Sequence, residues 1–170
     1  YHTTSSTTYT TSDLATDHIN GTPSPLAPIG RARASRASCS SAPTPLVLVV
    51  GLGGVGSHAA HLLVRAGVTR LRLVDFDQVT LSSLNRHATA TRADVGTSKA
   101  HALRDALVRI NPEAEIEAIV EVFNATSVER VLSAATELVI DAIDDLPTKA
   151  LLLRSCFHRE LRVLCALGAG

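Results

Sequence analysis

Residues 46–56 read Leu-Val-Leu-Val-Val-Gly-Leu-Gly-Gly-Val-Gly, an apolar run that passes directly into a cluster of glycines. An unbroken apolar run of this kind is typical of a parallel strand that is covered on both faces. Gly51, Gly53 and Gly56 have the spacing GxGxxG, with Gly54 between them. Such glycines allow a tight turn in which the N–H groups of the next helix approach phosphate. The stretch predicts a strand–turn–helix unit that binds a nucleotide; the alternative is that the glycines serve the turn alone.

The rest of the chain alternates short apolar runs with amphipathic segments. We expect strands at residues 46–50, 71–75, 116–122, 138–144 and 162–166, and helices at residues 57–66, 99–110, 127–135 and 148–159. Strands that alternate with helices form right-handed crossovers and a parallel sheet covered on both faces. We therefore predict an α/β, Rossmann-like, doubly wound and mainly parallel sheet. The long loop at residues 77–98 would lie at the carboxyl ends of strands, where ligands bind in such sheets.

The chain divides into two parts by composition. Residues 1–45 are rich in Thr, Ser, Ala and Pro and hold few large apolar side chains. Such a segment cannot bury enough surface to offset the entropy lost on ordering, so we expect a disordered, low-complexity linker. Its basic, serine-rich residues 31–40 also suit a transit peptide. Residues 46–170 are expected to form the ATP-binding domain, as a fragment that is incomplete at its C-terminus because it ends in a glycine turn after the fifth strand.

The bulk composition gives no sign of several classes of function. Lys and Arg number 16 and Asp and Glu number 16, so no net charge attracts the chain to nucleic acid or to an anionic membrane. An RNA substrate is not excluded, because a local patch of charge could bind it. The three cysteines form no CxxC pair, which argues against a zinc knuckle or a redox pair. No apolar run approaches the roughly 18 residues of a transmembrane helix, so no such helix is expected.

Several charged residues follow the predicted strand ends. Asp75 stands at about the distance from the glycines at which an acid binds ribose hydroxyls, and Asp77 follows it as a second candidate. Arg86 and Lys99 then supply two cations in one loop. A nicotinamide enzyme needs no such pair, whereas an enzyme that adenylates a carboxylate must bring two anions together. We therefore predict ATP as the nucleotide, with Arg86, Lys99 and Asp144 as the catalytic residues.

The fourth predicted strand ends in further acids. Asp144 is the candidate ligand of Mg²⁺ on the ATP phosphates, because hard cations prefer oxygen ligands. Asp141 is expected to orient its neighbours from within the sheet. Cys165 is expected to be a packed core residue rather than a nucleophile. His58 and His61 lie three residues apart, but no third ligand accompanies them, so a zinc site is not favoured.

Five motifs in order carry a family resemblance. They are Gly51–Gly56, Asp75–Val79, Ser82–Arg86, Gly96–Ala100 and Ile140–Asp144. Together they resemble the adenylating domain of the ubiquitin-activating-enzyme superfamily over residues 46–170. The loop from Val74 to His87 is most similar to the eukaryotic, fungal-type tRNA threonylcarbamoyladenosine dehydratases.

The resemblance implies a reaction and a set of partners. ATP would adenylate the carboxylate of threonylcarbamoyladenosine in tRNA, and ring closure would release AMP with the net loss of one water. The glycines, Asp75, Asp77, Ser83 and Asn85 would bind ATP, although Ser83 stands where many relatives have asparagine. Residues 31–45 show no arginine-bearing helix of the kind that reaches the partner's ATP site in relatives. The resemblance further implies a homodimer and a cytoplasmic or mitochondrion-associated protein.

Three other functions stay open on the sequence. The first is adenylation of the C-terminus of a ubiquitin-like or sulfur-carrier protein, which uses the same motifs. The second is a nicotinamide-dependent dehydrogenase, which shares the glycine pattern. The third is a nucleotide-binding module without enzymatic activity.

Overall fold

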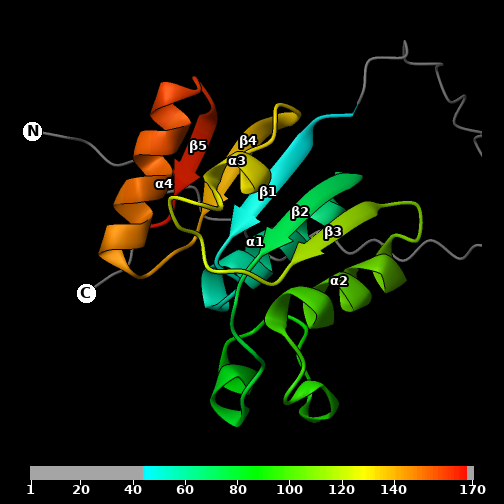
Figure 1. The fold of residues 1–170 in the computed structure, drawn as a ribbon. Coiled ribbons are helices and arrows are strands. Elements are labelled where there is room, and N and C mark those ends of the chain that lie inside the picture. The colour runs from blue at the N-terminus through cyan, green and yellow to red at the C-terminus, as the bar shows by residue number, and fades with distance from the viewer. Residues whose placement is uncertain (1–43, 168–170) are drawn as a thin grey trace, which may run out of the picture. The chain divides into compact units, whose positions relative to one another are not determined.

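The structure is a computed structural model that describes residues 44–167. Within this range five parallel strands form one sheet in the order β3-β2-β1-β4-β5 (Figure 1). The strand order reverses between β1 and β4, and ligands bind at such a switch point. The predicted linker and the predicted glycine turn after the fifth strand lie outside the described residues, apart from residues 44 and 45 and the first residues of that turn.

Each strand alternates with helical segments as the sequence pattern predicts. The strands are β1 (Leu46–Val50), β2 (Arg70–Val74), β3 (Glu115–Ile119), β4 (Thr136–Asp141) and β5 (Arg162–Cys165). The α-helices are α1 (Gly54–Arg65), α2 (Lys99–Ile110), α3 (Val128–Val131) and α4 (Leu146–His158). Two short 3-10 helices, η1 (Leu81–Asn85) and η2 (Arg92–Asp94), lie between β2 and α2. The predicted doubly wound α/β fold is confirmed.

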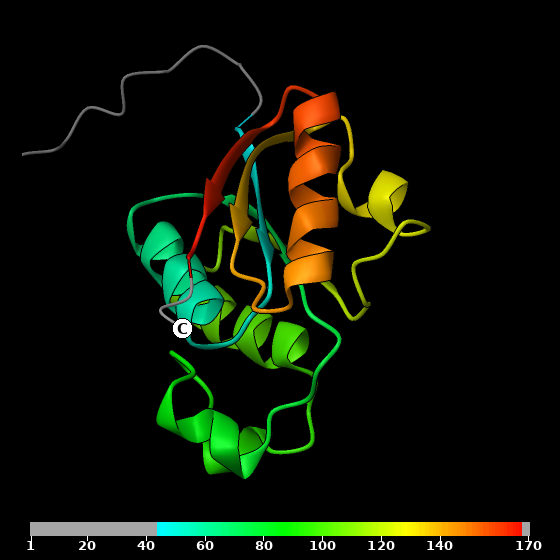
Figure 2. The same ribbon diagram turned by 90° about the vertical axis from the view of Figure 1, so that its left-hand side faces the viewer.

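Helices cover both faces of the sheet (Figure 2). On one face, α1 and α2 bury Ala60, Val64, Leu103 and Leu107 against β1 and β2. On the other face, Val131 and Leu132 at the end of α3, and Leu152 and Cys156 of α4, pack against β1 and β4. The central strand β1 is buried along its whole length, which explains its unbroken apolar sequence.

The loop between β2 and α2 is fixed at its base. The Val79 N–H donates to the Thr97 carbonyl at 2.8 Å, and the Gly96 N–H donates to the Val79 carbonyl at 2.9 Å. An antiparallel bridge between Gln78 and Ser98 adds to this pairing. We refer to these paired segments, residues 78–79 and 96–98, as the neck of the loop. The neck places both 3-10 helices outside the sheet and holds the start of α2 next to the end of β2.

Several predicted boundaries were wrong by a few residues. The third strand ends at Ile119 rather than at residue 122, and the fourth ends at Asp141 rather than at Asp144. The predicted helix at residues 127–135 is a single turn, α3. The helix at residues 99–110 has the predicted bounds, because Ser98 caps its N-terminus and Asn111-Pro112 ends it.

Within residues 44–167, no helix is both long and apolar enough to cross a membrane.

We predict that Cys156 makes stability depend on alkaline pH. Cys156 is fully buried, and burial with the nearby Asp141 charge raises the pKa of its thiol from 9.0 to about 11. The folded state therefore disfavours the thiolate. The contribution of the buried, neutral thiol to the free energy of unfolding is fully present below pH 9 and is lost as the pH rises toward 11. Urea unfolding of the native protein and of Cys156→Ala across pH 8–11 measures it.

The comparison with Cys156→Ala also controls for the other groups that titrate between pH 8 and 11, because both proteins contain them. Its free energy of unfolding should be lower at pH 8 because of the smaller side chain, and should fall less steeply above pH 9. Parallel pH profiles for the two proteins would contradict the assignment.

Candidate functional site

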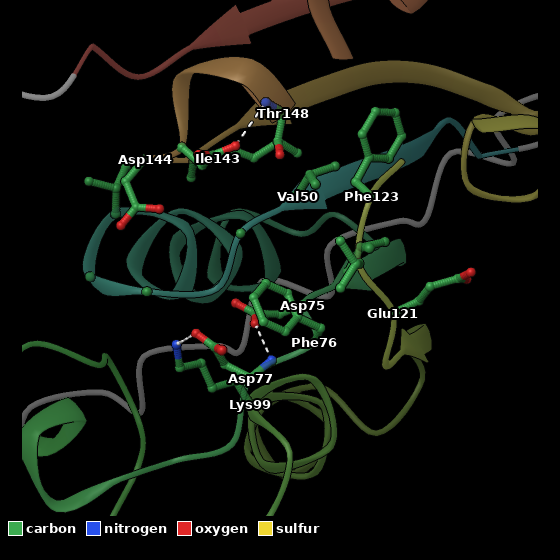
Figure 3. A pocket seen from close by; sticks show the side chains of 18 of the residues that line it. Val50, Asp75, Phe76, Asp77, Lys99, Glu121, Phe123, Ile143, Asp144 and Thr148 are labelled. Carbon is green, nitrogen blue, oxygen red and sulfur yellow. Dashed lines mark hydrogen bonds and ion pairs between the residues drawn. The ribbon is translucent and has the colours of Figure 1, made fainter. Parts of the chain in front are cut away.

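A cavity of about 350 Å³ opens at the carboxyl ends of β1, β2 and β4. Its volume lies within the range of small-molecule sites in proteins. Eight of the predicted site residues line it: Gly51, Gly53, Gly54, Asp75, Asp77, Arg86, Lys99 and Asp144. Figure 3 shows the ion pair of Lys99 with Asp77 below the glycine turn and Asp144 above it. The fold therefore brings together cations and acids from four separate stretches of sequence.

The glycine turn owes its shape to two of its glycines. Gly51 has a φ of +85°, and a Cβ there would lie 2.7 Å from the Ala142 carbonyl oxygen. A Cβ on Gly56 would lie 1.8 Å from the Gly51 carbonyl oxygen. At Gly53, by contrast, a Cβ would meet nothing within 4 Å. Gly51 and Gly56 thus close the turn, whereas Gly53 leaves open space on the wall of the cavity.

The N-terminus of α1 is suited to an anion. Gly53 is the N-cap residue, and no side chain caps the helix through a hydrogen bond. The first N–H groups of a helix lack partners within the helix and carry a partial positive charge. At this position they border the cavity, as the lining by Gly53, Gly54 and Val55 shows. A phosphate group in the cavity would supply the missing acceptors.

Asp75 connects the end of β2 to the glycine turn. Its Oδ2 accepts the Leu52 N–H at 2.6 Å and its Oδ1 accepts the Asp77 N–H at 2.8 Å. Burial raises the pKa of this carboxyl group, and the two backbone hydrogen bonds oppose that rise. The carboxylate keeps further lone pairs for ribose hydroxyls, because each oxygen can accept more than one hydrogen bond.

Lys99 enters the cavity from the first residue of α2. Its Nζ lies 2.7 Å from Asp77 Oδ2, and its backbone N–H donates to the Asp77 carbonyl at 2.9 Å. The lysine side chain is 11% exposed and the Asp77 side chain 48%. The exposed acid therefore holds a largely buried cation at the cavity wall, where ATP phosphates would be a second partner for it.

Arg86 lies at the C-terminal end of η1, beside the glycine turn. Its Nη1 donates to the Ser82 carbonyl at 3.0 Å and to Asn85 Oδ1 at 3.3 Å. A Cβ on Gly54 would contact the aliphatic part of this side chain at 3.6 Å. The guanidinium has five N–H donors, so further donors remain for phosphate oxygens.

Three of the predicted cofactor-binding residues do not line the cavity. Gly56 is buried in the turn described above. Ser83 is also buried, and its hydroxyl accepts the Thr80 N–H at 3.2 Å, which fixes the start of η1. Asn85 is exposed and accepts from Arg86. Ser83 and Asn85 therefore support the segment that carries Arg86. Their direct contact with a nucleotide stays a prediction, and neither residue lines the cavity.

Asp144 lies in the loop between β4 and α4, three residues beyond the strand end. It is exposed, and within the described residues its carboxylate has no hydrogen bond or ion pair. No group of three His, Cys, Asp or Glu side chains arranged to hold a metal occurs in residues 44–167. Magnesium is commonly held by one or two carboxylates together with phosphate oxygens and water. The single carboxylate of Asp144 fits that donor set.

Sequence reasoning missed Lys149, which is buried in α4. Its Nζ lies 2.8 Å from Oδ2 of the fully buried Asp141 and 3.0 Å from the Ala166 carbonyl. Burial opposes the charge, yet the hydrogen bonds to Asp141 and Cys165 outweigh it and raise the pKa of the amine. The signal in the sequence was the spacing of Lys149, Leu152 and Cys156, which puts a lysine on an apolar helix stripe.

Asp141 and Cys165 complete this cluster. Asp141 Oδ1 accepts the Ile143 N–H at 3.1 Å, so the acid orients the loop that carries Asp144, the role that the sequence analysis gave it. Cys165 is half-buried rather than packed in the core, and its Sγ donates to Asp141 Oδ2 at 3.0 Å. That hydrogen bond raises the pKa of the thiol, which argues against a nucleophilic role.

Comparison with known proteins places this geometry in a family. The model of the ThiF family matches residues 33–170. The chain belongs to the ThiF family. Its solved relatives include a tRNA N6-threonylcarbamoyladenosine dehydratase of Escherichia coli in complex with ATP, with 35% identity and a TM-score of 0.71 over 74% of this chain and 52% of that one.

Two curated relatives of this ThiF-family chain differ in what they act on. One is the tRNA threonylcarbamoyladenosine dehydratase 2 of Saccharomyces cerevisiae, 42% identical over 125 residues, which cover 72% of this chain and 28% of the relative. The other is the molybdopterin-synthase adenylyltransferase of Escherichia coli, 40% identical over 115 residues, covering 68% of this chain and 46% of the relative. The chain thus spans less than half the length of these curated relatives.

We predict that two glycine substitutions in this ThiF-family chain separate folding from ligand binding. Gly56→Ala should destabilise the fold by on the order of 3 kcal/mol, because its Cβ would overlap the Gly51 carbonyl oxygen. Gly53→Ala should change stability by less than about 1 kcal/mol, because its Cβ meets no atom. Thermal melting measures both effects.

Gly53→Ala should nevertheless weaken ATP binding about tenfold, because the methyl group projects into the space over the turn. Isothermal titration calorimetry with ATP measures this change. Equal losses of stability in the two variants would show that the turn does not have the described geometry.

We also predict that the Asp141–Lys149 pair stabilises the β4–α4 junction. Lys149→Met leaves the buried Asp141 carboxylate without its partner and should cost about 3–5 kcal/mol in the free energy of unfolding. Lys99→Met removes a lysine whose partner Asp77 is half-exposed, so it should cost no more than about 1 kcal/mol. Urea denaturation compares the two; similar values would mean that Asp141 is solvated.

Proposed function

We propose that the protein catalyses the ATP-dependent dehydration of threonylcarbamoyladenosine in tRNA by adenylating its carboxylate. The observation that carries the proposal is the meeting of the glycine turn, Arg86, Lys99 and Asp144 around one cavity. Two cations beside an uncapped helix N-terminus suit the approach of a carboxylate to the α-phosphate of ATP. The 42% identity to the Saccharomyces cerevisiae dehydratase supports tRNA as the substrate.

Each residue has a defined task in this proposal. The α1 N-terminus and Gly53 bind phosphate, and Asp75 accepts hydrogen bonds from the ribose. Lys99 moves its charge from Asp77 to the phosphates, while Arg86 stabilises the charge that develops on the α-phosphate as the carboxylate attacks. Asp144 would hold Mg²⁺, which neutralises phosphate charge when bound. The attack of the carboxylate on the α-phosphate breaks the bond between the α- and β-phosphates and releases diphosphate. In the second step a nucleophilic atom of the threonylcarbamoyl group attacks the activated carbonyl and gives up its proton, which closes the ring and releases AMP.

Partners and compartment are proposed on the family resemblance. We propose a homodimer, and an association with mitochondria as in the fungal-type dehydratases. A cross-linking experiment on the purified protein, and fractionation of cells that express it, test these two points.

A second candidate is adenylation of the C-terminus of a ubiquitin-like or sulfur-carrier protein. The 40% identity to the molybdopterin-synthase adenylyltransferase favours it specifically. Both reactions begin with a carboxylate and ATP, so the cavity suits either substrate. The outcome with each acceptor distinguishes them.

The deciding assay incubates the full-length protein with magnesium-ATP and tRNA that bears threonylcarbamoyladenosine. Mass spectrometry of the nucleosides, under conditions that preserve the cyclic product, should show an ATP-dependent loss of one water. No loss beside an active control dehydratase would overturn the proposal, and ATP–diphosphate exchange that depends on a carrier protein would favour the second candidate.

Substitutions within the cavity should lower this activity strongly. Arg86→Ala should lower kcat about a hundredfold, because an aimed donor at the developing charge is lost. Arg92→Ala is the matched control, since Arg92 is an exposed arginine of the same loop that does not line the cavity. Comparable losses in the two variants would contradict the assigned role of Arg86.

A further inference from the structure

Ser57 links the first turn of α1 to the segment that follows Arg86. Its hydroxyl donates to the Gly53 carbonyl at 2.6 Å and accepts the Ala88 N–H at 3.0 Å. The Gly54 carbonyl lies 3.2 Å from the same hydroxyl. Ser57 is fully buried, so water cannot replace these partners. One side chain thus joins the phosphate-binding turn to a residue two positions beyond the arginine.

The segment itself is ordered by its own hydrogen bonds. The Ser83 carbonyl accepts the Arg86 N–H at 3.2 Å and the His87 N–H at 2.9 Å. The His87 Nδ1 accepts the N–H groups of Thr89 and Ala90 at 3.3 and 3.1 Å. Because Nδ1 is an acceptor, the hydrogen bonds assign the proton of this buried imidazole to Nε2. These hydrogen bonds join the segment from Ser83 to Ala90 into one turn that carries Arg86.

This turn is connected to the rest of the domain through the chain and through hydrogen bonds. The chain runs through the neck at residues 78–79 and 96–98, which lies at the end of β2 and the start of α2 rather than at the glycine turn. Among the hydrogen bonds of the described residues, the one that the Ala88 N–H donates to the Ser57 hydroxyl joins α1 to this turn. The Ser57 hydroxyl is therefore the hydrogen-bonded link between the phosphate site and the segment that carries the guanidinium.

We propose that Ser57 is a positioning residue, which holds Arg86 in register with the glycine turn through the Ala88 N–H. The inference rests on the proposed function for its consequence, since Arg86 is assigned there to the phosphates of ATP. Ser57 does not line the cavity and acts through Arg86. Its replacement removes both the acceptor of the Ala88 N–H and the donor to the Gly53 carbonyl.

Hydrogen exchange tests the link without any ligand. Ser57→Ala should speed exchange of the Ala88 amide about tenfold and leave the amides of β1 unchanged. Ser155→Ala is a matched control, because the Ser155 hydroxyl donates to the Leu151 carbonyl at 2.8 Å, also four residues back in a helix. That variant should not change Ala88. Unchanged exchange of Ala88 in Ser57→Ala would overturn the proposal.

A double-substitution cycle tests whether Ser57 acts through Arg86. Ser57→Ala should weaken ATP binding roughly three- to tenfold in the native background and leave it unchanged in an Arg86→Ala background. Ser57→Cys keeps the size of the side chain with a weaker donor and acceptor. In the native background its ATP affinity should therefore lie between the affinities of the native protein and of Ser57→Ala. An equal effect of Ser57→Ala in both backgrounds would show that the residue acts on the turn alone and would overturn the positioning role.

The two readouts separate this inference from the proposed function. If the native protein binds ATP but leaves threonylcarbamoyladenosine unchanged, the proposed reaction fails while the cycle still decides the role of Ser57. If the native protein binds no ATP, the positioning of a phosphate-binding arginine is overturned together with the proposed function. Faster exchange of Ala88 would then describe a structural link only.

Discussion

Gly56 lies against the carbonyl oxygen of Gly51, so close that no side chain fits between them. This contact bends the chain at the end of β1 and sends α1 back along the sheet with its N-terminus at the cavity. Asp75 then secures the turn from β2 through the Leu52 N–H. Because β1 is the central strand, every other element of the site is placed with respect to this turn. The cations arrive from one side of it, and Asp144 arrives from the other.

Two lysines have acidic partners, and the burial of the partner differs between them. Lys149 meets a fully buried Asp141, and their pairing leaves neither group accessible to a ligand. Lys99 meets a half-exposed Asp77 at the cavity wall. An ion pair that reaches solvent holds its partner weakly, so an incoming polyanion competes well for the lysine. The first pair therefore stabilises the fold. The second pair holds Lys99 at the cavity wall, where a bound polyanion would replace Asp77 as its partner.

The sequence predicted most of the fold because its patterns are local and strong. Residues 46–50 are apolar without a break, and Ser98 and Asn111-Pro112 mark both ends of α2. Strand ends were less predictable. Val120 and Val122 continue the apolar pattern of β3, yet they are 47% and 44% exposed beyond the end of the pairing. Apolar character alone does not show where hydrogen bonding between strands stops.

Part of the candidate site was also readable from the sequence, since motifs at strand ends converge in a parallel sheet. The supporting residues were not. Lys149 was missed because a lysine in a helix is ordinarily exposed, and its partner Asp141 belongs to a strand. Ser57 was missed because its partner, the Ala88 N–H, is 31 residues away and carries no side-chain signal. Links of this kind depend on tertiary structure, which a motif does not encode.

Residues 96–98 of the neck at the base of the β2–α2 loop lie between the two cations along the chain, so each cation has its own anchor. Lys99 follows the neck directly, whereas Arg86 lies inside the loop and is held to α1 from there. The part of the loop between these two anchors, around Thr91 to Val95, is bound to neither the glycine turn nor the sheet by the described hydrogen bonds of its N–H groups. A change in the length of this segment would therefore leave the anchors of both cations in place. An insertion there would add surface beside the cavity without moving either cation from its anchor.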